Sequence, residues 1–439
     1  MPTNRPLRQR HPHPASSLYN GGTIVEENPM VEVNPVKLGI KRPAVRGLLP
    51  DPDPRAVHYT LISCDDHLLE PPHAFEGRLP AKYQDMAPKV VETEEGHEVW
   101  SIDGTPYFQV GFMAVAGRPK EDQRMEPSRF SEVRRGCWDI HARIQDMDLG
   151  GVWGSVNFPS GVTGFGGTLF SEFRDQEFGL ACVRAWNDWL YEEWHGSYPD
   201  RIAALGITHL TDPVLGAEEV RRNAKRGFRA MTLPERPHTR NLPSVYSDHW
   251  DPLIRACAET GTCINLHVGS GGFTPQPEGA PMLEVGATMF QAQAFTSCAE
   301  WLWAGWASKY PDLKIVMSEG GIGWVAGLID RLDNIMSRSG YGGGWADKEM
   351  GPSDRLRNNF WFTMIDDPST VSTILPTLGV ENVMAESDYP HGDGTWPDTQ
   401  EVLKGLIGHL SPEDQRKICC ENASQVYGLP VPTDAVPKL

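Results

Sequence analysis

Short apolar runs alternate with longer amphipathic runs along most of the chain, and this alternation restricts the fold more than any other feature of the sequence. Eight short runs lie at 59–64, 151–158, 202–207, 227–233, 262–267, 313–318, 359–363 and 382–386. The amphipathic runs lie at 131–149, 170–198, 213–225, 247–260, 283–309, 323–337, 368–378, 396–410 and 412–427. Strands that alternate with helices predict an α/β fold built on a parallel sheet.

Eight strand–helix units in one chain are typical of a (β/α)8 TIM barrel, in which the strands close into a ring and the helices surround it. The alternative is an open, doubly wound sheet that binds a dinucleotide. No G-x-G-x-x-G motif follows the first short run, so this alternative lacks its usual phosphate-binding turn. We therefore expect residues 58–427 to form a barrel.

Three segments fall outside the strand–helix rhythm. Residues 1–57 are rich in proline and are predicted to form an extended arm, which either packs on a neighbouring subunit or remains a free tail. Residues 89–110 alternate apolar and polar side chains around Asp103-Gly104, which predicts a β-hairpin inserted after the first strand. Residues 428–439 are expected to form a C-terminal tail.

Composition excludes several classes of partner. The formal net charge of −18 favours solubility and argues against nucleic acid or an anionic membrane as a partner. No apolar run approaches the roughly 18 residues of a membrane span. The eight cysteines include no C-x-x-C pair, so we expect them to be reduced and buried, as in a cytoplasmic protein.

Acidic and histidine side chains follow several of the short runs. In a barrel of this type the active site lies where the strands end. Six residues are expected there: Asp65, His67, His267, Glu319, Asp388 and His391. Any one of them alone is more often structural, but together they predict a site for a divalent metal, since imidazole and carboxylate groups are its usual ligands.

Four sequence stretches resemble one family. They are D-D-H-L-L-E-P-P (65–72), N-L-H-V-G-S-G-G (265–272), S-E-G-G-I-G-W (318–324) and S-D-Y-P-H (387–391). This set is similar to the amidohydrolase-related family, in the branch of aminocarboxymuconate-semialdehyde decarboxylase and the hydroxybenzoate decarboxylases. The resemblance implies a (β/α)8 barrel with one divalent metal, for which we favour zinc over manganese.

The resemblance also implies roles for individual residues. The metal ligands would be Asp65, His67, His267 and Asp388, with D-D-H as a carboxylate variant of the family's H-x-H or E-x-H motif. After the sixth strand the family often has a histidine that handles protons, and Glu319 stands in its place here. Glu319 is then a base, a ligand or both. If the reaction is a hydrolysis, Asp388 would accept the proton of the metal-bound water, and Glu319 or His391 would assist.

Two reactions fit such a site. The first, which we favour, is non-oxidative decarboxylation of a small carboxylated or aromatic compound. The second is hydrolysis of an amide, an ester or a related bond, with a metal-activated water as nucleophile. A barrel that binds a small molecule without turnover is the third and most remote reading.

Three further residues are predicted as substrate contacts. His209 ends the third unit, while His238 and Arg240 follow the fourth strand and are candidates for binding an anionic substrate. The tryptophans of the run 283–309 are expected to be core or subunit contacts. A homodimer or a higher homo-oligomer is expected from base rate.

Overall fold

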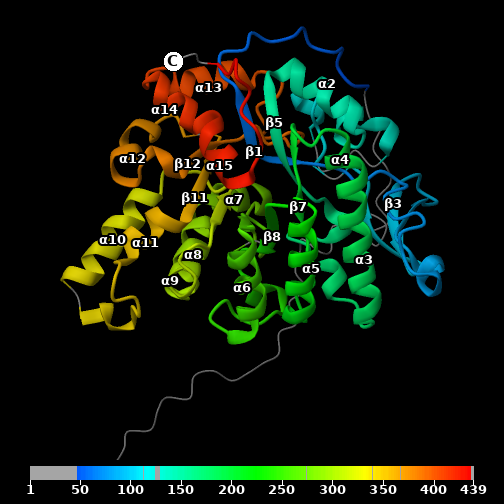
Figure 1. The fold of residues 1–439 in the computed structure, drawn as a ribbon. Helices are drawn as coiled ribbons and strands as arrows, with labels where there is room; N and C mark the ends of the chain where they lie inside the picture. The colour runs from blue at the N-terminus through cyan, green and yellow to red at the C-terminus, as the bar shows by residue number, and fades with distance from the viewer. Residues whose placement is uncertain are drawn as a thin grey trace, which may run out of the picture.

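The strands form a closed barrel, as the alternation predicts. The structure is a computed structural model that describes residues 47–111, 113–123, 129–272, 274–338, 340–365 and 367–436. The barrel strands are β1 (Leu61–His67), β5 (Val152–Phe158), β6 (Ile202–Ala203), β7 (Leu205–Gly206), β8 (Ala230–Pro234), β9 (Cys263–His267), β10 (Ile315–Ser318), β11 (Phe360–Met364) and β12 (Val383–Ala385). They run parallel in chain order (Figure 1), so the predicted (β/α)8 fold is confirmed.

The barrel ring has one interrupted strand and one seam. The third strand is broken at Ala204, so that β6 pairs with β5 while β7 pairs with β8. The seam lies between β1 and the chain that follows β12. There the Asp388 N–H donates to the Asp65 carbonyl at 2.8 Å, and the His67 N–H donates to the Tyr389 carbonyl at 2.7 Å. These backbone bonds close the ring beside the residues of the predicted site.

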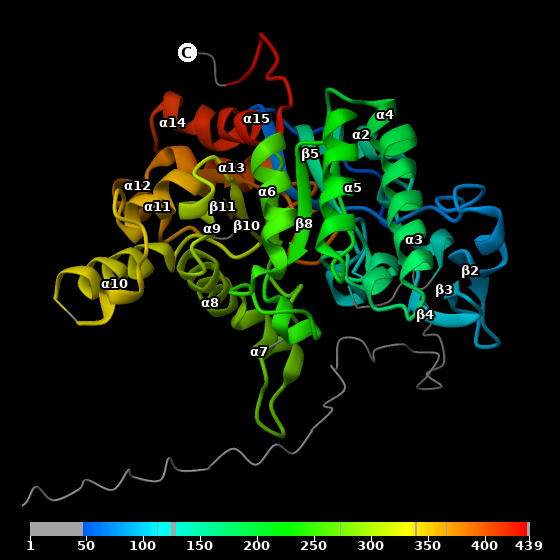
Figure 2. The same cartoon turned by 60° about the horizontal axis from the view of Figure 1, so that its bottom comes forward.

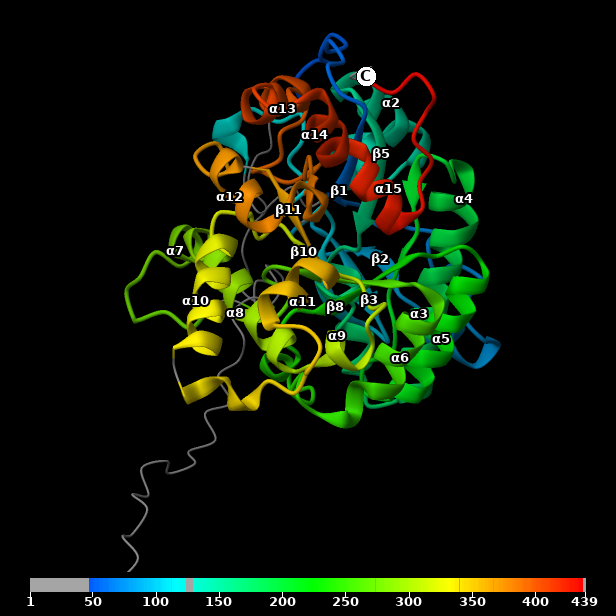
Figure 3. The ribbon, with the colours of Figure 1, turned by 60° about the vertical axis from the view of Figure 1, so that its left-hand side comes forward.

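Helices surround the strands, as Figure 3 shows most directly. They are α2 (Ile140–Gly150), α3 (Gln176–Trp189), α4 (His195–Ser197), α5 (Pro213–Lys225), α6 (Asp251–Thr260), α7 (Met282–Thr288), α8 (Phe290–Trp303), α9 (Trp306–Lys309), α10 (Val325–Ser337), α11 (Pro352–Asn359), α12 (Val371–Leu378), α13 (Thr399–Ile407), α14 (Pro412–Arg416) and α15 (Asn422–Tyr427). Side-chain caps begin several of them. Asp212, for example, accepts hydrogen bonds from the backbone of Val214 and Leu215 at the start of α5. None of these helices is long and apolar enough to span a bilayer.

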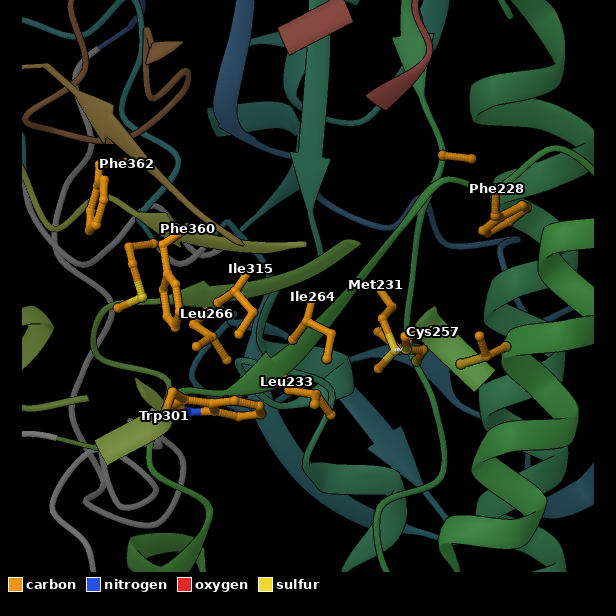
Figure 4. Close-up of a cluster of buried hydrophobic side chains, with 14 of the residues drawn as sticks. Phe228, Met231, Leu233, Cys257, Ile264, Leu266, Trp301, Ile315, Phe360 and Phe362 are labelled. Atoms are coloured by element: carbon orange, nitrogen blue, oxygen red, sulfur yellow. Dashed lines mark hydrogen bonds between the residues drawn. The ribbon is translucent and has the colours of Figure 1, made fainter. Parts of the chain in front are cut away.

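Two apolar cores hold the barrel together. The outward faces of β8 to β11 pack against the helices in one cluster, part of which Figure 4 shows with Leu233, Ile264 and Trp301. A second cluster fills the barrel interior and includes residues of α15. The Tyr427 hydroxyl donates to Asn265 Oδ1 at 2.7 Å inside it. The end of the barrel opposite the predicted site is therefore plugged by α15.

A small antiparallel sheet occupies the stretch expected to form a hairpin. Its strands are β2 (Lys89–Glu92), β3 (Glu98–Ile102) and β4 (Thr105–Gln109), and Asp103-Gly104 connects the last two. The sheet therefore has one strand more than a hairpin. It lies to one side of the barrel (Figure 2).

The chain on either side of the barrel contacts it. Most of the predicted arm, residues 1–46, lies outside the described residues. The remainder is anchored, since the Leu49 N–H donates to the Gly117 carbonyl at 2.8 Å. At the other end the Thr60 N–H donates to the Val436 carbonyl at 2.5 Å. We retain the division at residues 57 and 427 as a proposal.

Candidate metal centre

The six residues predicted at the strand ends meet in one place. They come from four barrel strands and the loops that follow them. Asp65 and His67 lie on β1, His267 ends β9, Glu319 follows β10, and Asp388 and His391 follow β12. Potential ligand atoms of these residues form overlapping groups in which all the atoms lie within 4.8 Å of one another.

A bulge in β1 directs the first two side chains into the site. From Ser63 to Asp66 the strand advances three residues while β5 advances two, so one residue of β1 is extra. Cys64 belongs to the buried cluster inside the barrel. Asp65, within the bulge, and His67, beyond it, converge with the other ligand-type side chains. Simple strand alternation would have sent Cys64 and Asp65 to opposite faces.

The inner part of the site consists of one carboxylate and two imidazoles, all buried. Asp65 lies between them, with Oδ1 at 3.4 Å from His67 Nε2 and Oδ2 at 3.3 Å from His267 Nε2. The two Nε2 atoms are 3.2 Å apart. His267 Nδ1 lies 2.8 Å from the Val268 carbonyl, which only accepts, so this nitrogen carries the proton. His267 Nε2 therefore points into the site, where it can ligate a metal once the imidazole is neutral.

The outer part brings in the acids after β10 and β12. Asp388 Oδ1 lies 3.3 Å from His67 Nε2 and 3.1 Å from His391 Nδ1. Glu319 Oε2 lies 3.3 Å from His267 Nε2. The structure thus joins all four predicted ligands and both additional catalytic candidates in one chain of contacts.

Glu319 and Asp388 both have left-handed backbone conformations, with φ values of 58° and 51°. Non-glycine residues adopt this region infrequently, and such residues are concentrated at functional sites. A hydrogen bond from Glu319 N–H to Thr363 Oγ1 at 2.9 Å secures the first turn. The turns aim both carboxylates across the barrel mouth, where they meet the histidines.

The carboxylate oxygens of the site fit a bound cation. Both oxygens of Asp65 and both oxygens of Asp388 are buried and have no hydrogen-bond donor. The nearby imidazole nitrogens lie at contact distance but not in hydrogen-bond geometry. Buried ionised groups without partners are costly, and a divalent cation among carboxylates and imidazoles removes that cost. The donor set therefore matches a metal centre.

The charged groups of the site favour a bound cation. Burial by itself lowers the pKa of His267, but the carboxylates of Asp65 and Glu319 raise it to about 10. Burial raises the pKa of Glu319 to about 8. It also raises the pKa of Asp388 well above its usual range, with a further contribution from Glu319. The fold thus places more negative charge here than the histidines neutralise.

Aromatic rings enclose the histidines. The ring of Phe165 stacks on His67 with centroids 5.9 Å apart and meets the edge of His267 at 4.5 Å. Phe158 contacts His267 at 4.8 Å, and His391 stacks on His67 at 3.7 Å. These rings limit water at the site and offer a flat apolar surface to a substrate.

The three predicted substrate contacts lie elsewhere on the same end of the barrel. His209 is buried with Nδ1 accepting from the Asp212 N–H at 3.3 Å. His238 is exposed in a short helical turn, and Arg240 pairs with Glu172 at 3.3 Å. Within the described residues no recorded contact joins these three side chains to the metal cluster. Their roles stay predictions.

Two acids of the site were not singled out from the sequence. Asp393 shares a group of ligand atoms with Glu319, Asp388 and His391. Glu386 follows the last residue of β12 and is buried, with both carboxylate oxygens lacking a hydrogen-bond donor. Both stand in the same stretch as Asp388, but a loop rich in glycine and proline does not reveal which of its acids point inward.

Known proteins with this architecture support the comparison suggested by the motifs. A structure of an amidohydrolase from Mycobacterium avium subsp. paratuberculosis K-10 is 23% identical, covers 85% of this chain and 100% of its own, and gives a TM-score of 0.64. A 5-carboxyvanillate decarboxylase variant from Novosphingobium aromaticivorans, with bound manganese, is 18% identical over 86% and 100% of the chains, with a TM-score of 0.60. The 2,6-dihydroxybenzoate decarboxylase from Rhizobium is 14% identical over 84% and 99%, with a TM-score of 0.57.

These likenesses show a shared fold, and a family model shows more. The model for the family described as amidohydrolase matches residues 105–429, which is well over half of the 439 residues. The match contains β5 to β12 and the loops that carry His267, Glu319 and Asp388. On the strength of this match and of the donor set at the barrel mouth, the chain belongs to the amidohydrolase family of metal-dependent enzymes.

Proposed function

We propose that this enzyme is a non-oxidative decarboxylase of a small aromatic compound that carries a hydroxyl group beside its carboxylate. The observation that carries the proposal is the position of Glu319, a carboxyl group at the end of β10 that touches the metal cluster through His267. A decarboxylase needs an acid that delivers a proton to carbon. The decarboxylases with the same fold add support.

One divalent metal would be held by four side chains: Asp65, His67, His267 and Asp388. When bound, it supplies Lewis acidity that fixes and polarises the substrate's oxygens. Zinc suits the two imidazoles, and manganese, found in the 5-carboxyvanillate decarboxylase structure, suits the carboxylates equally. The flat rings of Phe158 and Phe165 would pack on the aromatic ring of the substrate.

Glu319 would act as the general acid. Burial raises its pKa to about 8, and a nearby cation lowers it from that value toward neutrality, where a general acid works best. Glu319 transfers its proton to the ring carbon that bears the carboxylate. The bond from that carbon to the carboxylate then breaks, its electron pair returns to the ring, and CO2 leaves. Glu319 regains a proton from water.

Hydrolysis of an amide, an ester or a related bond is the second candidate. The contact of 3.1 Å between Asp388 and His391 favours it. Burial, together with His67 and His267, lowers the pKa of His391 well below its usual range, so its imidazole is neutral and able to accept a proton. Asp388 and His391 together would then take the proton of an attacking water.

Product analysis separates the two reactions. The metal-loaded protein is incubated with hydroxybenzoates labelled with ¹³C in the carboxylate, and separately with amides and esters of similar size. Release of labelled CO2 supports the decarboxylase, whereas hydrolysis of the second panel without any CO2 supports the hydrolase.

Glu319→Gln tests the assigned acid. The variant should lower kcat for CO2 release by about 10²- to 10⁴-fold, since general acid catalysis contributes on that order. Glu218→Gln, on the exposed face of α5, is the matched control and should leave the rate unchanged. Full activity in Glu319→Gln would remove Glu319 from the mechanism.

A further inference from the structure

A cavity adjoins the turn that carries Asp388 and His391. Three segments that are far apart in the sequence enclose it: the end of the arm at 49–55, the loop at 116–123 and the turn at 389–398. Its volume is about 390 Å³, which lies in the range of pockets that hold small molecules. Among the described residues that line it, none is one of the four assigned metal ligands. The cavity is therefore a separate site from the metal centre.

Hydrogen bonds join the walls of the cavity to one another. The Pro390 carbonyl accepts from the Val115 N–H at 2.9 Å and from the Ala116 N–H at 3.1 Å, which fixes the loop against the turn. Arg55 Nε donates to Asp398 Oδ1 at 2.8 Å, which fixes the arm against the end of the same turn. The cavity is thus built by long-range contacts of the fold.

The lining of the cavity is positively charged. Of the described residues that line it, three are cations and one is an anion: Arg55, Arg118, Lys120 and Asp398. Asp398 is already paired with Arg55. No salt bridge within the described residues involves Arg118 or Lys120. In a chain whose formal net charge is −18, this local excess of positive charge selects for an anion.

Arg118 supplies a buried cation without a carboxylate. The residue is 4% exposed, its Nη2 donates to the Glu132 carbonyl, and its buried Nε has no acceptor. Burial lowers the pKa of Arg118, and attraction by Asp122 offsets this only in part. A buried charged group without a full set of partners is costly, and a bound anion removes that cost. A carboxylate suits the fork of a guanidinium particularly well.

The remaining walls of the cavity are apolar and rigid. They include five proline rings and one indole ring: Pro50, Pro52, Pro119, Pro390, Pro397 and Trp396. The Trp396 Nε1–H donates to the Asp146 carbonyl at 2.8 Å, so its only polar group is already used. The indole therefore offers apolar surface to a ligand, and a flat ring packs well on such a surface.

We propose that this cavity binds a small carboxylate that bears an aromatic ring, at a site outside the metal centre. The carboxylate would pair with Arg118, with Lys120 adding attraction from the exposed side. The ring would pack between Trp396 and the prolines. The bound molecule would also contact His391, which lines the cavity and lies 3.1 Å from Asp388. This site does not depend on which reaction the metal centre performs.

Ligand binding to the metal-loaded, full-length protein tests the proposal, with 4-fluorobenzoate as the probe and ¹⁹F NMR as the readout. We expect saturable binding that persists after a chelator has removed the metal. Arg118→Gln should weaken binding by about 10- to 100-fold, since a charge-assisted hydrogen bond is lost. Lys120→Gln should weaken it by about 2- to 5-fold, because an exposed charge is screened. Arg135→Gln, which changes an exposed arginine paired with Asp139, is the matched control and should bind as the wild type does.

Further probes and variants check the chemistry of the site. The uncharged 4-fluorobenzyl alcohol should not bind, and inorganic phosphate should not displace 4-fluorobenzoate. Arg118→Lys, which restores a positive charge, should recover part of the affinity lost in Arg118→Gln. Circular dichroism verifies that each variant is folded, and Lys120→Gln changes an exposed side chain that the fold does not need.

Four results would overturn the proposal. The first is the absence of saturable binding to the wild type. The second is unchanged affinity in folded Arg118→Gln and Lys120→Gln. The third is loss of the probe on removal of the metal, which would place it at the metal centre. The fourth is equal binding of phosphate, which would show that the cavity does not recognise a ring. None of these results bears on the decarboxylase proposal, which rests on Glu319.

Discussion

The carboxylate of Asp66 accepts a hydrogen bond from the backbone N–H of Tyr389 at 3.1 Å, and so ties the first strand of the barrel to the turn after the last. The same carboxylate accepts from the hydroxyls of Ser387 at 2.5 Å, Ser63 at 2.9 Å and Ser155. Asp388 lies between two of these donors along the chain. Asp66 therefore holds the backbone that presents Asp388 to the metal.

Removal of this carboxylate should weaken metal binding without removing a ligand. We expect Asp66→Ala to lower metal affinity by about 10- to 100-fold, as loss of outer hydrogen-bond partners commonly does. It should also lower the free energy of unfolding by about 1–3 kcal/mol, since buried donors lose their acceptor. Asp66→Asn, which keeps one acceptor, should be intermediate. Lower stability with unchanged metal affinity would mean that Asp66 does not position the site.

Asp388→Asn should remove bound metal yet leave the protein folded. Burial and Glu319 raise the pKa of Asp388, so a neutral side chain relieves repulsion in the protein that a chelator has freed of metal. We therefore expect Asp388→Asn to have a higher Tm than the metal-free wild type. Elemental analysis should show that the variant has lost its metal. Asp200→Asn, which changes an exposed aspartate ahead of β6, serves as the control for both readouts. Full metal content in Asp388→Asn would exclude it as a ligand.

The metal-free protein, prepared with a chelator, should lose stability as the pH rises. Burial raises the pKa of Glu319 from 4.5 to about 8, so between these values the folded state binds a proton that the unfolded chain has released. The free energy of unfolding then falls with increasing pH in this window. Urea unfolding from about pH 5 to about pH 8, in the presence of a chelator, measures the slope. Glu319→Gln should be flatter, and an equal slope in both proteins would contradict the burial of this charge.

A change at the other end of the barrel should affect stability alone. Tyr427→Phe removes the hydroxyl that donates to Asn265 inside the barrel. It should lower the free energy of unfolding by about 1–3 kcal/mol because Asn265 loses its donor. Metal content and kcat should stay at wild-type values, since residues at the end of a barrel opposite the active site contribute to stability and not to catalysis. A loss of metal would show that the two ends are coupled.

The sequence predicted the ring and most of its metal cluster for a simple reason. The carboxyl ends of all the strands meet at one end of a barrel. A residue's type and its position at a strand end are therefore enough to predict that it belongs to the site. The structure brings His267, Glu319 and Asp388 together at the barrel mouth, as this reasoning expects, and their roles stay predictions. The predicted first strand ended at Cys64, but β1 continues to His67, because buried polar side chains are tolerated where they face a cluster of ligands.

Other features depend on tertiary contacts that no local pattern records. The break at Ala204 follows from strand pairing on both sides of the ring. The bulge in β1 is visible only against its partner strand. The sequence does not predict α11 because this helix is short and mostly polar. Its proline, Pro352, lies in the first turn, where a helix tolerates it. Asp393 and Glu386 lie in a turn whose path sequence cannot trace.

The left-handed turns at Glu319 and Asp388 have a consequence for how the chain evolves. Glycine adopts such a backbone freely, so Glu319→Gly should release strain on the order of 1 kcal/mol and also remove a buried charge. The same change abolishes the assigned acid. Selection for a higher free energy of unfolding and selection for catalytic turnover therefore act in opposite directions at these two positions.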